Sequence, residues 1–385
     1  MTFRWEAGAS RVRLLRRRPP ILVIGGAGYV GSVLCRRLLA DGYHVRVLDA
    51  LFYGEESVAS LRADPNFELR QGDSRDITAL VAAMRDVRAV VHLGEIVGDP
   101  ACSLDERTTR EINLAATLTA ARVAKGQGIE RFVYASSCSV YGASDEILTE
   151  SSSLNPLSLY ARAKIGAERA LHDLGDGAFQ PIILRLATVF GLSWRPRFDL
   201  VVNVLTARAV ADREITVVGG DQWRPFVHVR DVAKAIAECL QKPIVVVGGQ
   251  TFNVGSDSEN YTIRGIGEIV RQSIPETAMK VLADEGDPRN YRVSFGKIRR
   301  VLGFEPGMTV AQGVRELRDA LRAGTIGDYR SPRYSNVMAL GQPDGNRSLR
   351  PSRIDYLPTP GIVGPVLVAA AAEERPARAP LMQSA

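Results

Sequence analysis

The chain has 385 residues, of which 45% are apolar and 24% charged, as is typical of a soluble globular protein larger than one average domain. Its formal net charge is +6, but six arginines and one glutamate lie in the first nineteen residues, which indicates a solvated basic arm rather than a nucleic-acid-binding surface. The cysteines form no close pairs and the histidines show no ligand spacing, which argues against disulfides and structural zinc and favours a reducing cytoplasm. The apolar patch at 362–372 contains Gly364 and Pro365 and is too short to cross a membrane.

A strand-like run at residues 21–24 leads into a glycine-rich turn and then into an apolar pattern at helical spacing. The turn reads Gly25-Gly26-Ala27-Gly28-Tyr29-Val30-Gly31. This order is typical of the first strand, turn and helix of a dinucleotide-binding βαβ unit. Backbone amides at the helix start would face a pyrophosphate, and glycine lets the backbone approach it closely. The turn therefore predicts a dinucleotide site.

A second strand-like run, at residues 44–48, ends in Asp49. A carboxylate at this place accepts hydrogen bonds from the ribose hydroxyls of the adenosine and would repel a 2′-phosphate. We therefore expect the dinucleotide to be NAD rather than NADP.

Further strand-like runs, at 67–69, 89–93, 131–135 and 182–186, alternate with helical patterns such as 77–84 and 111–125. Strands separated by helices predict an α/β fold with a doubly wound parallel sheet of Rossmann type. Beyond Thr188 the elements become shorter, with helices at 231–240 and 263–273 and a loop at 248–260. This half is predicted to form a smaller C-terminal α/β substrate-binding domain.

The predicted boundaries follow from these patterns. Residues 20–187 are expected to form the dinucleotide-binding domain, with 226–247 returning to it, and 188–328 the substrate-binding domain. Residues 1–19 and 329–385 are rich in Arg, Pro, Ala and Ser without sustained periodicity, so both are expected to be poorly ordered arms.

Tyr160 and Lys164 lie four residues apart in a helical run that follows a loop at 155–156. At this spacing both side chains share one helix face, so the ammonium can lie near the phenol and favour the phenolate. A phenol with a lowered pKa can act as a general base or acid. Ser136 and Ser137 lie at the end of a predicted strand, where a hydroxyl could reach the same substrate oxygen. Either feature alone also fits a plain helix or a polar turn.

Taken together, these features resemble the extended short-chain dehydrogenase/reductase family, in its NAD-dependent nucleotide-sugar epimerase/dehydratase branch. The resemblance covers residues 20–328 and rests on the order and spacing of several motifs. Those motifs are the glycine turn, Asp49, Gly72-Asp73, Val91-His92-Leu93, Asn113, Ser136-Ser137, Tyr160-x-x-x-Lys164 and Leu184-Arg185-Leu186.

The resemblance implies that Tyr160 is the catalytic acid/base, that Lys164 binds the nicotinamide ribose and lowers the pKa of Tyr160, and that Ser137 hydrogen-bonds the reacting oxygen. It implies NAD as the cofactor, with Asp73 at the adenine, and a homodimer that pairs through the helix carrying Tyr160. The implied cofactor-binding residues are Gly25, Gly28, Tyr29, Val30, Gly31, Asp49, Asp73, Ser74, Leu93, Tyr160 and Lys164. The implied binding residues for a nucleotide-diphosphate sugar are Ser137, Asn203, Arg224 and Arg289.

Three departures from the family pattern leave alternatives open. Glu95, after Gly94, stands where the family usually has alanine, and Thr188 stands where many epimerases have asparagine. Cys138-Ser139 replace the Asp-Glu pair of the 4,6-dehydratases, so elimination of water lacks its acid and base. The leading hypothesis is an epimerase that acts through a transient keto-sugar. The alternatives are an NAD(P)H-dependent keto-sugar nucleotide reductase and a non-catalytic dinucleotide-binding partner protein.

Overall fold

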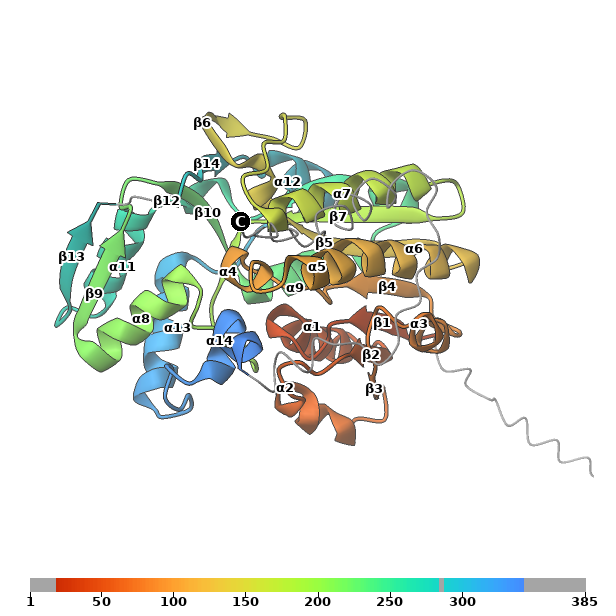
Figure 1. Ribbon diagram of the computed structural model, residues 1–385, viewed down its shortest axis with the longest axis horizontal. Coiled ribbons are helices and arrows are strands. Elements are labelled where there is room, and N and C mark those ends of the chain that lie inside the picture. The colour runs from red at the N-terminus through yellow and green to blue at the C-terminus, as the bar shows by residue number, and fades with distance from the viewer. Residues whose placement is uncertain (1–18, 284–286, 343–385) are drawn as a thin grey trace, which may run out of the picture.

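The computed structural model describes residues 19–283 and 287–342 (Figure 1). Its centre is a seven-stranded sheet in which every pair of neighbours is parallel. This confirms the predicted doubly wound α/β fold. Across the sheet the order is β11 (Thr251–Val254), β7 (Gln180–Leu186), β5 (Arg131–Ser137), β4 (Ala89–His92), β1 (Ile21–Ile24), β2 (Val45–Asp49) and β3 (Phe67–Gln71).

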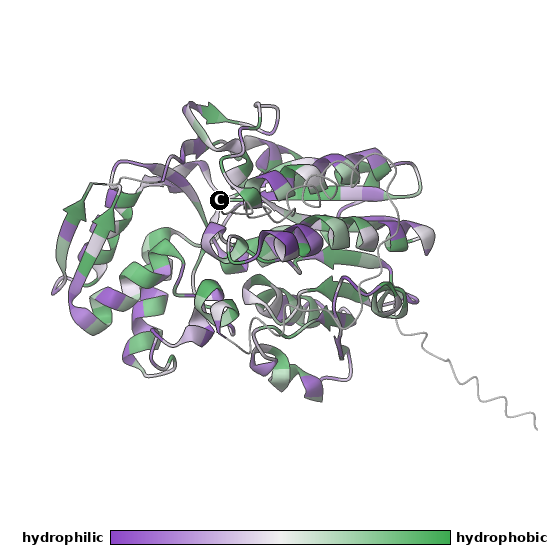
Figure 2. Cartoon of the chain, viewed as in Figure 1, coloured by the Kyte–Doolittle hydropathy of each residue, from purple (hydrophilic) through white to green (hydrophobic). Residues whose placement is uncertain are grey.

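Helices cover both faces of this sheet, and the alternation of side chains along β1 shows why. Ile21 and Val23 belong to the core on the face covered by α1 (Tyr29–Ala40) and α9 (Val229–Gln241), whereas Leu22 and Ile24 belong to the opposite core. That opposite face carries α3 (Ile77–Met84), α6 (Thr117–Gly126) and α7 (Leu159–Leu174). Figure 2 shows the apolar strands enclosed between these helices. Strands buried on both faces read as continuous apolar runs, as here.

The later part of the chain builds a second, smaller unit with its own core, which includes Phe190, Ile215, Phe226 and Val310. It lies to one side of the large sheet (Figure 1). Its helices are α8 (Val201–Asp212), α11 (Ile263–Ser273) and α13 (Val310–Arg322). Three small sheets accompany it: β12 (Asn260–Thr262), β10 (Trp223–His228) and β8 (Thr188–Phe190); β13 (Ala278–Leu282) and β9 (Glu214–Val218); and β14 (Asn290–Val293) and β6 (Ala143–Leu148).

Short elements complete the described chain. They are α2 (Glu56–Ala59), η1 (Ser60–Ala63), α4 (Asp99–Cys102), α5 (Glu106–Arg110), η2 (Glu111–Ala116), η3 (Cys138–Tyr141), α10 (Ile244–Val247), η4 (Asp257–Glu259), α12 (Gly296–Leu302), η5 (Pro332–Tyr334) and α14 (Asn336–Gly341).

Two expectations about the later chain were wrong. The predicted loop at 248–260 contains β11, which pairs in parallel with β7 and is the edge strand of the main sheet. The expected arm from 329 onward folds, up to residue 341, into η5 and α14, because Leu340 is buried against Ile96 and Ile112. The remaining expectations for the arms, 1–18 and 343–385, lie outside the described residues.

All four cysteines are free and buried. Among the described residues, no group of His, Cys, Asp and Glu is arranged to hold a metal ion. No helix in that part of the chain has the length and apolarity that crossing a membrane requires.

Candidate active site

Two cavities open at the carboxyl ends of the parallel strands, the edge at which ligands bind in open α/β sheets. The small cavity, of about 80 Å³, is lined by residues that follow β2 and β3, among them Asp49, Asp73 and Ser74. The large cavity, of about 620 Å³, contains Ser137, Tyr160 and Lys164. The two share part of their lining, namely Gly25, Gly28, Tyr53, Leu93 and Glu95. Together they form one elongated cleft.

The glycine turn occupies the centre of this cleft. Gly25 has a φ of +82°, and a Cβ there would lie 2.6 Å from the Cα of Gly94 in the turn after β4. A Cβ at Gly31 would lie 2.3 Å from the carbonyl oxygen of Gly25, so glycine allows α1 to pack against the turn. The N-cap residue of α1, Gly28, has no side chain to cap the helix. The first amides of α1 are thus available to an anion in the cleft.

Two acidic residues of the small cavity, Asp49 and Asp73, lie at the ends of neighbouring strands. Asp49 accepts hydrogen bonds from the backbone amides of Ala27 and Leu51, each at 2.8 Å. Burial raises the pKa of Asp49, and these two hydrogen bonds oppose that shift. Asp73 forms an ion pair with the buried Arg75, with Oδ2 and Nη2 2.7 Å apart. Both carboxyl groups are therefore held in fixed positions on the cavity wall.

Ser137, Tyr160 and Lys164 meet in the large cavity as predicted. Ser137 is the last residue of β5. The helix α7 begins at Leu159 because the side chain of Ser158 caps it, accepting a hydrogen bond from the amide of Ala161 at 3.2 Å. Burial raises the pKa of Tyr160 well above 10, the charge of Glu95 raises it further, and hydrogen bonding with Ser137 lowers it. The pKa of Tyr160 is therefore raised, whereas the spacing of Tyr160 and Lys164 predicted that it would be lowered.

Glu95 changes the electrostatics of this group. Its Oε2 lies 2.6 Å from the Nζ of Lys164, and both side chains are almost completely buried. Tyr134 donates its hydroxyl to Oε1 of Glu95 at 2.8 Å, and Lys164 also donates to the carbonyl of Ala135. The carboxylate therefore offsets the positive charge that Lys164 presents to Tyr160.

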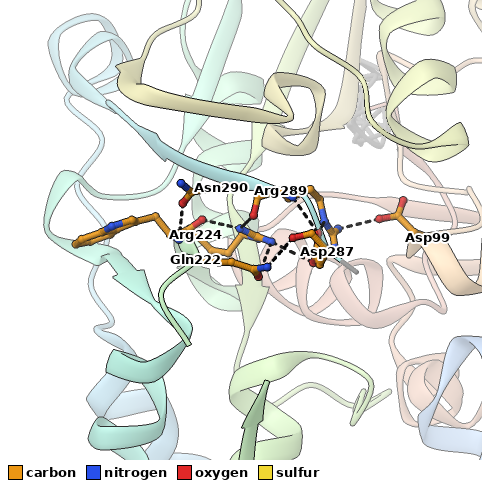
Figure 3. Close-up of polar contacts among 7 residues, drawn as sticks. Asp99, Gln222, Arg224, Asp287, Arg289 and Asn290 are labelled. Atoms are coloured by element: carbon orange, nitrogen blue, oxygen red, sulfur yellow. Dashed lines mark hydrogen bonds and ion pairs between the residues drawn. The ribbon is translucent and has the colours of Figure 1, made fainter. Parts of the chain in front are cut away.

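Arg224 and Arg289 converge on Asp287 at the far end of the large cavity (Figure 3). The Nη2 atoms of the two arginines lie 3.1 Å and 2.6 Å from Oδ2 of Asp287. Arg289 also reaches Asp99, with Nη1 and Oδ2 2.8 Å apart. Burial raises the pKa of Asp287, but the hydrogen bonds and charge of Arg289 outweigh it and hold that pKa at about 2. The structure thus brings together two arginines from distant segments.

Asn203 lies apart from the other predicted residues, because it lines neither cavity. Its amide accepts a hydrogen bond from the backbone of Gly191 at 2.9 Å and donates to the carbonyl of Arg197 at 2.8 Å. Both ends of the side chain are therefore used within the protein. Cys138 is also removed from the cleft: it is buried, and its thiol donates to the carbonyl of Arg185.

Three further residues of the large cavity, Tyr53, Arg195 and Asn336, were not identified from the sequence. Each lies in a connecting segment or just inside a short helix, where no periodic pattern marks a functional residue. The one visible signal is the pair of arginines around Pro196, two residues before the Asp199 carboxylate.

Comparisons with known proteins identify the family of the chain. The sequence model of the "NAD dependent epimerase/dehydratase family" matches residues 21–255. A UDP-glucose 4-epimerase from Mycolicibacterium smegmatis is 31% identical over 318 residues, which cover 78% of this chain and 98% of that protein. A UDP-glucose 4-epimerase from Rhizobium meliloti is 30% identical over 320 residues, which cover 76% of this chain and 93% of that protein.

Solved structures show the same fold with ligands bound. A dTDP-glucose 4,6-dehydratase from Streptomyces venezuelae, with NAD, has a TM-score of 0.73 and 27% identity over 82% of this chain and 99% of its own. A UDP-glucuronic acid 4-epimerase from Bacillus cereus, with UDP-glucuronic acid and NAD, has a TM-score of 0.71 and 25% identity. The match covers 79% of this chain and 99% of that protein. With its glycine turn, strand-end acids and Ser137, Tyr160 and Lys164, the chain belongs to the NAD-dependent epimerase/dehydratase family, and its cofactor is NAD.

Proposed function

We propose that this protein is an NAD-dependent epimerase that acts on a nucleotide-diphosphate sugar through a transient keto-sugar. The observation that carries the proposal is the large cavity, because one lining contains Ser137, Tyr160 and Lys164, residues of the glycine turn and the paired arginines. The proposed cofactor site, acid/base and cationic site for phosphates thus share a single cleft. The UDP-glucose 4-epimerases among the relatives support this reading.

The chemistry divides between cofactor and protein. NAD held by the glycine turn and the strand-end acids would supply the hydride acceptor and donor that inversion of a sugar carbon requires. Tyr160 accepts the proton of the sugar hydroxyl and later gives it back, so it must pass through both protonation states. Ser137 donates a hydrogen bond to the same oxygen and orients it. Lys164 places a positive charge beside the phenolate as it forms.

Elimination of water is less well supported than epimerisation. Cys138 follows Ser137 where the dehydratases carry an acid, but burial raises the pKa of its thiol far above neutral pH. The thiol is also bound to the carbonyl of Arg185, 3.3 Å away. It is therefore a packed core residue without proton-transfer capacity, which leaves Tyr160 as the acid/base of the cleft.

For the substrate we propose that Arg224 and Arg289 bind the diphosphate. Guanidinium groups hold phosphate oxygens through charge-assisted, often bidentate hydrogen bonds. In the structure both arginines are occupied by Asp287, so a diphosphate would compete with that carboxylate for the same donors. Asn203 is not part of this proposal, because both ends of its side chain are hydrogen-bonded within the protein.

We further propose that the enzyme is cytoplasmic, because four buried free thiols fit a reducing compartment, and that it forms a homodimer through α7. Light scattering at micromolar concentration should give twice the mass of the chain. A strictly monomeric mass would contradict the dimer. Cell fractionation that places the protein outside the cytoplasm would contradict the location.

The decisive test of the function is Tyr160→Phe. We expect kcat with the nucleotide sugar that the wild type converts to fall by at least ~10²-fold, the usual loss when a general acid/base is removed. The amount of NAD bound to the variant should equal that of the wild type. Product formation from UDP-, dTDP-, GDP- and CDP-sugars would be followed by NMR. Activity near the wild-type rate would remove Tyr160 from the mechanism, and a requirement for added NAD(P)H would indicate the reductase instead.

A further inference from the structure

Arg195 lies in the segment between β8 and α8 and is buried, with a relative exposure of 6%. Its guanidinium carbon lies 3.9 Å from the centre of the Tyr53 ring. Among the described residues, Nε and Nη2 of Arg195 have no hydrogen-bond partner. Buried polar groups are nearly always hydrogen-bonded, and an unused buried guanidinium that lines a cavity indicates a ligand.

The charges around Arg195 do not supply the missing partner. Asp199 is bound to Arg197, with 2.9 Å between Oδ1 and Nε, and both oxygens of Asp49 accept backbone amides. Burial lowers the pKa of Arg195 to about 10, so the guanidinium still carries its charge at neutral pH. The large cavity therefore contains a buried cation with two free donors.

The ligand class follows from what shares this cavity. Arg195 lines it together with Gly25, Gly28 and the first residues of α1, whose amides face an anion. Tyr53, on which the guanidinium stacks, lines both the large and the small cavity. The cation is thus placed where the two halves of the dinucleotide site join.

We propose that Arg195 binds the pyrophosphate of NAD from the side opposite the glycine turn. The amides of α1 would hold one side of the two phosphates, and Nε and Nη2 of Arg195 would donate to the other. A residue from outside the dinucleotide-binding half would thereby close over the cofactor. The proposal goes beyond the proposed function because it concerns NAD alone and does not depend on which sugar reacts.

Asn336, the first residue of α14, positions this arginine. Its Oδ1 accepts from Nη1 of Arg195, while its Nδ2 donates to the carbonyl of Val97 at 3.1 Å. Its own amide donates to Asp199 at 3.0 Å. Asn336 therefore binds Nη1 of Arg195, and among the described residues Nε and Nη2 are the donors of this guanidinium that have no partner.

The test compares Arg195→Met with Arg195→Lys and with a control, Arg37→Met, which changes an exposed arginine on α1 that pairs with Asp41. Calorimetry on protein freed of NAD would measure binding of NAD, ADP-ribose, adenosine and UDP. For Arg195→Met we expect Kd for NAD and for ADP-ribose to rise by at least ~10-fold, as for loss of hydrogen bonds to a charged group, with adenosine and UDP unchanged. Arg195→Lys should be intermediate, because it keeps the charge and loses the planar fork of donors.

The result can contradict the proposal in three ways. Unchanged binding of NAD and ADP-ribose would remove Arg195 from the cofactor site. Weaker UDP binding with unchanged NAD binding would assign the arginine to the substrate diphosphate, and equal weakening of adenosine would move its contact away from the phosphates. Thermal unfolding without ligand provides the folding check, since a variant that keeps the wild-type Tm has lost a contact and not its structure. Because none of these readouts requires turnover, they are independent of the outcome for Tyr160.

Discussion

The carboxylate of Glu95 faces the ammonium of Lys164 at 2.6 Å, in a position where the resembled family has alanine. In that family the lysine acts on the tyrosine by its charge. Here part of this effect is cancelled, because the carboxylate lies as close to the ammonium as an ion pair allows. Asp99 and Cys102 also face Tyr160 and raise its pKa in the same direction. At the residue scale the site therefore favours the protonated, proton-donating form of Tyr160.

The pH dependence of turnover should show the effect of Glu95 on the pKa of Tyr160. Tyr160 must lose its proton before it can act as a base, so the acid limb of kcat/KM marks its pKa in the free enzyme. Glu95→Gln removes a negative charge near the phenol, which lowers that pKa, and the limb should move by ~1 pH unit or more toward lower pH. The measurement is the pH profile of the wild type and of the variant.

Tyr134→Phe is the matched control for this prediction. It removes the hydrogen bond to Glu95 but leaves the charge in place, so the acid limb should stay close to that of the wild type. A limb that moves to higher pH in Glu95→Gln, or that moves equally in both variants, would contradict the electrostatic role given to Glu95.

At the scale of elements, a buried ion pair attaches α7 to the sheet. Glu168, on α7, lies 2.7 Å from Nη2 of Arg185 on β7 and also accepts a hydrogen bond from Ser136 on β5. All three side chains are buried. Because Tyr160 and Lys164 lie on the same helix, this attachment sets where they stand relative to the strand ends.

Breaking one side of the pair should be costly. In Glu168→Ala the guanidinium of Arg185 would remain buried without its counter-charge, so the free energy of unfolding should fall by ~3–5 kcal/mol. The double variant Glu168→Leu with Arg185→Met replaces both charges by apolar groups. Its free energy of unfolding should fall by less than that of Glu168→Ala. Denaturant unfolding of the three proteins decides this, and a single variant within ~1 kcal/mol of the wild type would show that the pair behaves like a solvent-exposed one.

At the scale of the whole molecule, the cleft is closed by contacts between segments that are distant in the chain. Arg289, next to β14, reaches Asp99 on α4 across the large cavity, and both lie near the site proposed for the diphosphate (Figure 3). Binding of a diphosphate would have to exchange such carboxylate contacts for phosphate contacts. The substrate end of the cleft therefore depends on how the two halves of the chain meet.

Replacing either arginine of this end should weaken substrate binding alone. Arg224→Ala or Arg289→Ala should weaken binding of the UDP-sugar by ~1.5–3 kcal/mol, a ~10–150-fold rise in Kd, with NAD affinity unchanged. Arg292→Ala is the control, because Arg292 lies on the same strand as Asn290 but lines neither cavity. Calorimetry that finds undiminished binding in both arginine variants, or loss of NAD instead, would contradict the diphosphate site.

Much of the cleft could be predicted because its parts are local. The glycine turn, Asp49 and the pair Tyr160 and Lys164 each follow from spacing within one strand, turn or helix. All of these residues except Gly26 line one or both of the two cavities. Predicting β11 failed because four residues beside two glycines carry too little pattern, and burial against β7 decides their conformation. The helix α14 was missed for the same reason: it is six residues long and is held by packing of Leu340.

The sequence by itself determined the parallel sheet and its dinucleotide turn, and it indicated the side chains proposed to perform the chemistry, since periodicity and short spacings express the backbone preferences of neighbouring residues. Only the tertiary structure decided how charges are paired. Arg224 and Arg289 meet although 65 residues separate them, and Arg195 is held by Asn336 across 141 residues. The packing of distant segments decides which carboxylate pairs with a buried cation. It also decides which buried cation has no carboxylate beside it.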